Sequence, residues 1–379
     1  MALEVRIYDN DLASPILLQD ITYRMSNLTF STALNGGFKT CGFTISMSVE
    51  EAWNWLSREG KRGYHFNRVT VHDESILVWE GRIMDVQLHI DNSDQSINVI
   101  ALGYWSACQD QFYTSTGNTD WTSGSNHFMH EIIAEILTEE CPDISDDQTN
   151  LEEADVDLAG IDLSVKEYPL SRINQLVKVS ASDHVPWFFA IWDDRVPYLF
   201  KRNITQVDWR VWLDSFTDLR LDQSALELRN SVIPVQGTTL GTAVDNAASL
   251  LLYPRREVKF VLPTDTPSAP LEDAATMYGI EQSLPRQKQS FDISGKVYRA
   301  TSATGGRLEE VPKYLIRAGE VIRIQDLVPA SVPIALDDVR TFFIMETHYN
   351  ADRDTITIQP DRRARRLTST IVENIELNR

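Results

Sequence analysis

The feature that most constrains this chain is an alternation of apolar and polar residues through its N-terminal part. Alternation with a period of two is typical of β-strands that bury one face. It recurs in six segments, at residues 4–8, 43–47, 68–72, 76–83, 85–90 and 96–102. One helix is expected among them, because Ser48 and Glu51 have capping-box spacing before an apolar run to Leu56, and Gly60 and Gly63 follow. The pattern predicts a sandwich or barrel of about seven strands with one helix against it.

The next hundred or so residues change character, because helical and strand patterns mix there. Two helices are predicted at 127–137 and 170–179, followed by strands at 185–192 and 196–200 around a tight turn at 193–195. We therefore expect a small α+β domain inserted after the first β domain.

Strand patterns return in the last part of the chain. They lie at 209–213, 225–228, 231–235, 258–262, 321–324, 341–349 and 355–359. Residues 272–278 are a short helical candidate closed by Gly279. Residues 291–315, rich in Gly, Ser and basic residues, predict a protruding excursion.

The final hairpin of the chain is similar in pattern to one in its first part. Residues 68–73, 81–86 and 97–100 have counterparts at 321–326, 340–346 and 355–358, and both hairpins turn in Asp- and Asn-rich tips at 91–94 and 350–354. The similarity suits a duplicated domain, although any two hairpins share some of this pattern.

The predicted fold class is mainly β (α+β), with two β-barrel or sandwich domains, an inserted α+β domain and a second small insertion. The predicted boundaries are a first β domain at 1–105, the inserted domain at 106–207, a second β domain at 208–290 and 320–361, a small insertion at 291–319, and a C-terminal tail at 362–379.

The charge of the chain is strongly negative and unevenly spread. A net charge of −20 argues against non-specific binding to DNA or to an anionic bilayer. Residues 138–162 hold ten acidic residues and no Lys or Arg, whereas a basic cluster near the end consists of Arg362, Arg363, Arg365 and Arg366. We expect these arginines to contact acidic surface on a neighbouring subunit, because planar guanidinium groups engage carboxylates bidentately.

The sequence offers no recognisable catalytic, cofactor or metal site. His127, His130 and Glu131 would share one side of a helix, but the spacing is not a known zinc pattern, and no third ligand stands at a recognised distance. The cysteines Cys41, Cys108 and Cys141 form no pair motif. The loop at 237–241 has neither phosphate-binding nor dinucleotide-binding spacing. The N-terminus does not suggest a signal peptide, and no run is long enough for a membrane helix, so we expect a soluble protein made in a cytoplasm.

Several passages together resemble the hub proteins of phage tails and related injection machines. They follow one another along most of the chain, at 78–83 with 100–104, 190–199 with 209–211, 228–232 with 277–281, and 314–321 with 326–329, 341–347 and 356–361. The resemblance implies two tail-tube-like β-barrel domains joined by smaller domains. It also implies that three copies form a ring whose six barrels match a six-fold tail tube, with DNA only in passage.

The resemblance thus implies a non-enzymatic baseplate or tail-tip subunit in the virion tail, without a cofactor and made in the cytoplasm of a host bacterium. Its implied partners are further copies of itself, tail-tube or distal tail proteins, a tape-measure protein, and spike, fibre or receptor-binding subunits. A channel for DNA should not attract the polyanion. We therefore expect acidic side chains of the two hairpins to face the lumen, namely Asp85, Asp91, Asp94, Asp352 and Asp354.

Two other functions stay open from the sequence. A tail-associated peptidase or muralytic enzyme would need a nucleophile, metal or carboxylate site that the residues do not suggest. A host-glycan-binding module would rest on clustered aromatic residues such as Trp53, Trp187, Trp192 and Trp209.

Overall fold

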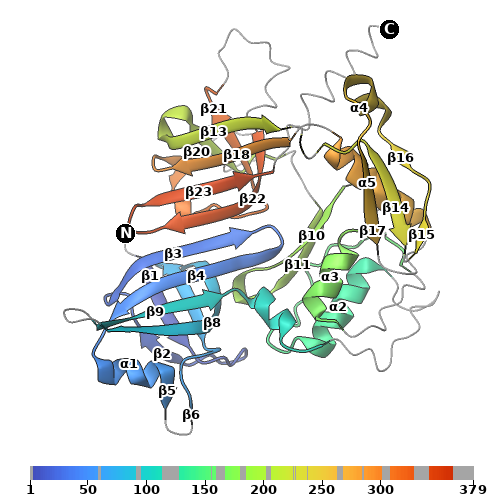
Figure 1. Ribbon diagram of the computed structural model, residues 1–379. Coiled ribbons are helices and arrows are strands. Elements are labelled where there is room, and N and C mark those ends of the chain that lie inside the picture. The colour runs from blue at the N-terminus through green and yellow to red at the C-terminus, as the bar shows by residue number, and fades with distance from the viewer. Residues whose placement is uncertain are drawn as a thin grey trace.

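A computed structural model gives the arrangement of most of the chain (Figure 1). It describes residues 3–361 except 59–60, 91–94, 113–127, 155, 159–166, 180–184, 202–205, 225, 227, 237, 263–267, 284–285, 301–307 and 328–340. In this part of the chain, one 17-stranded sheet dominates, accompanied by a four-stranded sheet and a two-stranded hairpin. The prediction of a mainly β fold is therefore confirmed.

The first part of the large sheet, here called the N-terminal segment, contains seven strands in the order β2-β1-β7-β8-β9-β4-β3. Their bounds are β1 Glu4–Tyr8, β2 Leu17–Asp20, β3 Met25–Ala33, β4 Gly36–Ser46, β7 Arg68–Asp73, β8 Ile76–Ile90 and β9 Gln95–Leu102. The strands predicted at 76–83 and 85–90 are one strand, β8, and a β-bulge between Ile83 and Asp85 explains the break in the pattern.

The predicted helix of this segment is α1, Val49–Leu56. Its capping box is present, since the Ser48 N–H donates to Glu51 at 3.2 Å and the Glu51 N–H donates to Ser48 Oγ at 3.3 Å. The helix ends before the two glycines, because the short hairpin of β5 (Ser57–Arg58) and β6 (Lys61–Arg62) follows it at once.

The C-terminal segment of the sheet has the order β13-β18-β23-β22-β21-β12-β19-β20. The bounds are β12 Trp209–Trp212, β13 Phe216–Ser224, β18 Arg286–Ile293, β19 Val297–Ala300, β20 Leu308–Val311, β21 Val321–Gln325, β22 Thr341–Asn350 and β23 Thr355–Pro360. The strand predicted at 225–228 was placed too late, since β13 precedes it and Leu226 lies in a turn.

Residues 291–319 differ from the expected excursion. They contribute the end of β18 together with β19 and β20, which pair within the large sheet, and Phe291, Val297 and Ile316 are buried in its core. Polar composition suggested a protrusion, but only one face of each strand needs to be apolar to reach the core.

The inserted α+β region has its own hydrophobic core, formed by the short helix η1 (Tyr104–Gln109), α2 (Met129–Glu140), α3 (Pro169–Leu176) and the hairpin β10 (Trp187–Ile191)–β11 (Pro197–Lys201). β10 also pairs in parallel with β4, where Ile191 lies opposite Gly37. Gly37 has a positive φ of +82°, and a Cβ there would lie 2.1 Å from the Ile191 carbonyl oxygen. Only glycine suits this approach.

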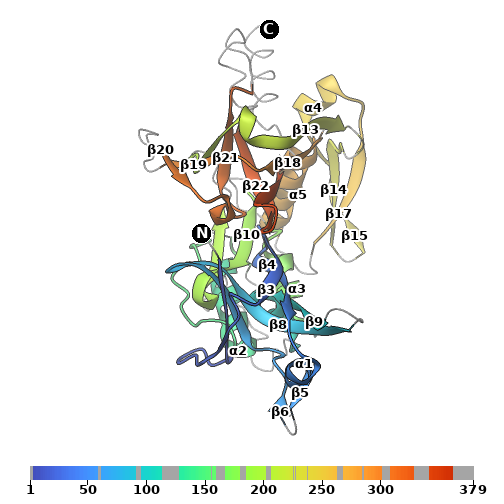
Figure 2. The ribbon, with the colours of Figure 1, turned by 90° about the vertical axis from the view of Figure 1, so that its left-hand side faces the viewer.

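The four-stranded sheet is separate from the large one in both views (Figure 1, Figure 2). It contains β14 Ser231–Gln236, β15 Thr239–Leu240, β16 Val244–Asp245 and β17 Glu257–Leu262, with α4 (Ala247–Leu252) and α5 (Ser268–Gln282). We had expected strands 231–235 and 258–262 in the second β domain; alternation identifies a strand but not the sheet that it joins.

The helix predicted at 272–278 is longer, and Gly279 lies inside it rather than closing it. A Cβ at Gly279 would approach Val232 Cγ2 to 3.3 Å, so the glycine permits close packing of α5 on β14.

The hairpins β8–β9 and β22–β23 have the same local design. Each carries a bulge after an isoleucine, between Ile83 and Asp85 in the first and between Ile344 and Glu346 in the second. The burial of the side chains also follows the same order in β8 and β22. In residues 83–87 and in residues 344–348, the five successive side chains are buried, half-buried, half-buried, buried and exposed.

The backbone beside each isoleucine repeats too. Phe66 donates to the Ile83 carbonyl and Ile83 donates to Asn67, while Gly319 donates to the Ile344 carbonyl and Ile344 donates to Glu320. Phe66 and Gly319 both have positive φ, 65° and 94°. These shared irregularities support a duplicated unit more strongly than strand pattern alone.

Candidate assembly site

The two segments of the sheet are joined by strand pairing between β3 and β22. The pairing is antiparallel, with Ala33 opposite Glu346 and Thr29 opposite Asn350. The hydroxyls of Thr32 and Thr347 are 2.6 Å apart, and the Ala318 N–H donates to Thr32 at 3.0 Å. The segments therefore form one continuous sheet, with hydrogen-bonded polar groups inside the junction.

A buried ionic cluster lies where the inserted region covers the N-terminal segment. Glu80 and Arg195 are both fully buried. Arg68 donates to Glu80 at 2.6 Å and to Asp194 at 3.0 Å, and the Arg195 N–H donates to Glu80 at 2.7 Å. The Arg195 guanidinium stacks over the Tyr104 ring at 4.3 Å. Burial raises the pKa of Glu80, although Arg68 and the Arg195 N–H act to lower it.

The turn that supplies this cluster is η2, Asp193–Arg195, between β10 and β11. Asp194 and Arg195 both have positive φ, 57° and 63°, a conformation that side chains other than glycine adopt at a cost. The ion pairs on both sides hold the turn in this shape. The tight turn was predicted, but its role as the centre of an ionic cluster was not.

Arg317 connects this turn to the C-terminal segment. Its guanidinium makes two bonds to the Asp193 carboxylate, at 2.8 and 2.9 Å, and a third to the Leu77 carbonyl at 2.8 Å. The Phe38 and Trp192 rings lie 5.2 and 5.6 Å from the guanidinium carbon. One side chain thus contacts the N-terminal segment, the inserted region and its own segment.

Sequence reasoning missed Glu80, Arg82, Arg195 and Arg317. Alternation along β8 indicates a strand with one buried face, yet Glu80 and Arg82 on its polar face are buried as well. The inserted region covers that face, where Arg82 donates to Ser106 at 3.0 Å and to Asp110 at 2.9 Å. The one available signal was that 78–83 and 190–199 both belong to passages that carry the family resemblance.

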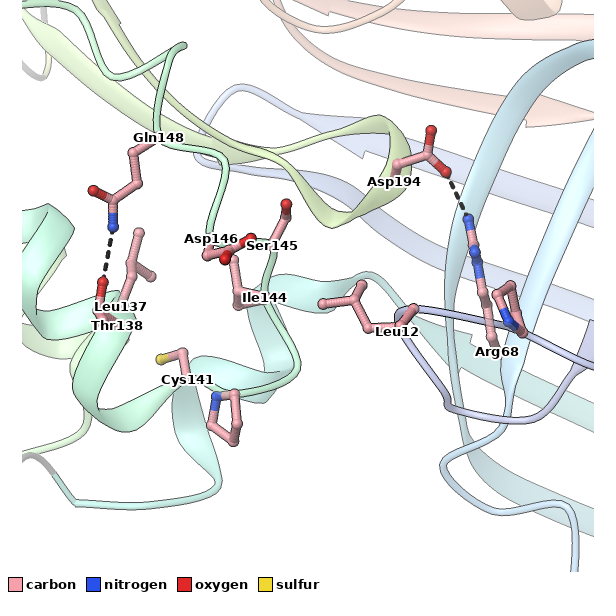
Figure 3. A pocket seen from close by; sticks show the side chains of 13 residues that line it. Leu12, Arg68, Leu137, Thr138, Cys141, Ile144, Ser145, Asp146, Gln148 and Asp194 are labelled. Atoms are coloured by element: carbon pink, nitrogen blue, oxygen red, sulfur yellow. Dashed lines mark hydrogen bonds and ion pairs between the residues drawn. The ribbon is translucent and has the colours of Figure 1, made fainter.

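A pocket of about 730 Å³ lies beside the cluster (Figure 3). It is lined by Leu12, Arg68, Asp194, the end of α2 and the loop at 141–148. Figure 3 shows Arg68 turned to Asp194 on one side, and Gln148 turned to Thr138 on the other at 2.9 Å. These polar groups are occupied with one another, and nothing in the lining selects a ligand class.

No group of three or more His, Cys, Asp or Glu side chains suited to a metal occurs among the described residues. His130 accepts a hydrogen bond from the Ala154 N–H at 3.0 Å, and His127 lies outside the described residues. The three cysteines are buried free thiols, and burial raises the pKa of Cys41. Of the tryptophans considered for glycan binding, Trp53 is 57% exposed, whereas Trp187, Trp192 and Trp209 are buried.

Three of the five aspartates expected at a channel are described. Asp85 is half-buried beside the β8 bulge and accepts from Gln87 at 2.6 Å, and Asp352 is exposed in the β22–β23 turn. Asp354 accepts from Lys313 at 2.7 Å and from the Tyr349 hydroxyl at 2.9 Å. Burial acts to raise the pKa of Asp354, but these two donors lower it below its ordinary value.

The remaining predicted site residues are not described. Asp91 and Asp94 lie outside the described residues, as do Arg362, Arg363, Arg365 and Arg366. Among the described helices, none is both long and apolar enough to cross a bilayer.

No protein-family model matches the chain, and no curated protein matches it. Solved structures do. The 43 kDa tail protein of prophage MuSo2 from Shewanella oneidensis is 12% identical with a TM-score of 0.57, over 95% of this chain and 96% of that one. The tail protein from Neisseria meningitidis MC58 is 10% identical with a TM-score of 0.61, over 97% and 98%. Prophage tail protein gp18 from Listeria monocytogenes EGD-e is 12% identical with a TM-score of 0.50, over 98% of both.

These likenesses extend over nearly the whole length of each chain. The protein therefore has the fold of phage tail proteins, as the resemblance in its sequence implied. At such low identity the likeness establishes the fold alone.

Proposed function

We propose that this chain is a structural hub subunit of a phage or phage-like tail, placed in the baseplate or tail tip. Three copies form a ring whose six β-domains adapt a six-fold tail tube to a three-fold tip. The ring lines the channel through which DNA passes. Its neighbours are tail-tube or distal tail proteins, a tape-measure protein, and a spike, fibre or receptor-binding subunit.

The observation that carries this proposal is the repeat within the large sheet, on a fold shared with tail proteins. A chain with two similar β-domains presents six such domains when three copies assemble in a ring. A ring of this kind matches a six-fold partner on one face while keeping three-fold symmetry for the other. The predicted boundaries of the first β domain (1–105) and of the inserted region (106–207) are part of the same proposal. The second β domain in this proposal includes β19 and β20 and leaves out the separate β14–β17 sheet.

The negative charge supports a place beside passing DNA. With a net charge of −20, the chain offers little to hold phosphates. We place Asp85, Asp91, Asp94, Asp352 and Asp354 towards the lumen or its rims.

The basic cluster Arg362, Arg363, Arg365 and Arg366 belongs to the outside of the ring, against acidic surface of a neighbouring subunit. Changing these four arginines to Glu should impair assembly without unfolding the subunit, because surface substitutions alter stability little. Normal particle yield from that variant would show that the cluster is not an assembly contact.

Native mass spectrometry of the purified full-length chain tests the ring directly. We expect a species of three times the 43.1 kDa chain mass. A chain that stays monomeric both alone and in isolated tail tips would refute the proposal.

The expected lack of enzymatic activity is tested in parallel by incubation with peptidoglycan, where release of soluble fragments would contradict a purely structural role.

A further inference from the structure

The large sheet contains a continuous antiparallel run with an open edge at each end. Its order is β13-β18-β23-β22-β3-β4-β9-β8, and every neighbouring pair is antiparallel. Within the described residues, β13 pairs with β18 alone, and residues 85–88 of β8 pair with β9 alone. The two edges lie at opposite ends of the run, far apart in both views (Figure 1, Figure 2).

These two edges have counterparts that already meet inside the chain. β8 corresponds to β22, by the shared bulge and the shared burial pattern. β13 corresponds to β3, because their partner strands β18 and β4 correspond to each other. Each partner strand buries a phenylalanine and, two residues later, an isoleucine: Phe43 and Ile45 in β4, and Phe291 and Ile293 in β18.

Two details of register extend the second correspondence. Phe43 of β4 pairs with Val99 of the β8–β9 hairpin, and Phe291 of β18 pairs with Ile358 of the β22–β23 hairpin. Val99 and Ile358 are equivalent positions of the two hairpins, so β4 and β18 pair with them in the same register. β3 and β13 also each carry one extra residue opposite that strand, between Ser26 and Thr29 and between Phe216 and Asp218. The junction of β3 with β22 is therefore a template for β13 with β8.

We propose that β13 of one copy pairs antiparallel with β8 of a second copy, in the register of the internal junction. There, Thr29 lies opposite Asn350 and Phe30 opposite Tyr349. Carried over, Arg220 of one copy lies opposite His89 of the next, and Leu221 opposite Leu88. The inference rests on the proposed trimeric ring and specifies how its subunits are joined.

The exposure of the two open edges agrees with a missing strand on each. Tyr349 is buried under β3, whereas its counterpart Leu88 is only half-buried. Leu28 in β3 is buried, whereas its counterpart Leu219 in β13 is half-buried. Exposed edges of this kind are usually covered or blocked, because their free backbone groups recruit further strands.

The pairing is heterologous, since each copy uses β13 towards one neighbour and β8 towards the other. A heterologous contact forms a closed ring when its rotation closes, and an open filament otherwise. In the proposed ring, each contact between copies repeats the geometry of the internal β3–β22 junction. Six segments, two from each of three copies, then close the ring.

Disulfide crosslinking tests the register. In the variant with His89→Cys and Arg220→Cys, the new cysteines lie opposite each other only in the proposed pairing. The matched control carries Gln87→Cys with Arg220→Cys, since Gln87 is exposed on the same face of β8 but two residues away. A diagonal pair at that offset is too far apart for a disulfide. The three native cysteines are buried, so the oxidised protein is denatured in the presence of an alkylating reagent, which blocks these thiols as they become exposed.

We expect mild oxidation to convert the first variant into a covalent trimer on a non-reducing gel, and the control to stay as single chains. Native mass of both reduced variants verifies that they assemble. Trimers that do not crosslink, or that crosslink equally in the control, would overturn the β13–β8 pairing while leaving the proposed ring intact. A wild-type chain that is monomeric both alone and in isolated tail tips would overturn both.

Discussion

The β8–β9 and β22–β23 hairpins share a backbone design but differ in what surrounds them. Both have the bulge after isoleucine and the same pair of hydrogen bonds beside it. At the position that accepts from the isoleucine N–H, the first hairpin has Asn67 and the second has Glu320. Glu320 accepts from the Trp209 indole at 2.7 Å and from the Arg317 N–H at 2.8 Å. The comparison teaches that backbone irregularities persist where side chains have diverged to suit different neighbours.

The N-terminal segment also differs because β10 of the inserted region pairs with the start of β4. Gly37→Ala should break this pairing. The new Cβ would overlap the Ile191 carbonyl, and the positive φ adds strain. We expect a loss of about 3–5 kcal/mol in the free energy of unfolding, measured by urea denaturation. Gly42→Ala in the same strand is the control, because its Cβ meets Thr29 Oγ1 at an ordinary 3.4 Å. Equal losses in the two variants would contradict the account.

Arg317→Ala removes the side chain that connects the two segments through the η2 turn. Three charged hydrogen bonds are lost and Asp193 is left without this partner, so we expect a loss of about 2 kcal/mol. A double-mutant cycle with Asp193→Ala isolates the pair. Arg24→Ala, at an exposed ion pair with Glu51, should leave stability nearly unchanged. A coupling energy near zero between Arg317 and Asp193 would show that this ion pair does not stabilise the folded protein.

The sequence predicted the repeated hairpins, α1 with its capping box, the two helices of the inserted region and the β10–β11 turn, because each has a local signal. It did not predict the ionic cluster around Glu80. Alternation along β8 indicates that one face of the strand is buried, but it does not show that the inserted region covers the opposite face. Nor did the sequence separate the β14–β17 sheet from the large sheet, because strand patterns carry no information about distant pairing. The junction of β3 with β22 joins residues some three hundred positions apart, and β3 itself was not recognised as a strand.

Glu320→Gln should sharpen the comparison through the pH dependence of stability. Burial raises the pKa of Glu320 to about 7, although the Arg317 N–H and the Trp209 indole act to lower it. A folded-state pKa above the unfolded value favours folding at low pH, and this contribution is lost as pH rises through about 7. Thermal unfolding from pH 5 to 8.5 should show the melting temperature of the variant gaining on wild type with rising pH. A constant difference across this range would contradict the raised pKa of Glu320.

The central claim is that two similar segments of one sheet let three copies build a ring of six. A three-dimensional reconstruction of the assembled ring by electron cryomicroscopy tests it most directly. We predict three chains around a central channel, with six β-segments at similar spacing and β13 of each copy hydrogen-bonded to β8 of the next. A single copy at the tail axis, or three copies joined through surfaces other than these two edges, would contradict the account.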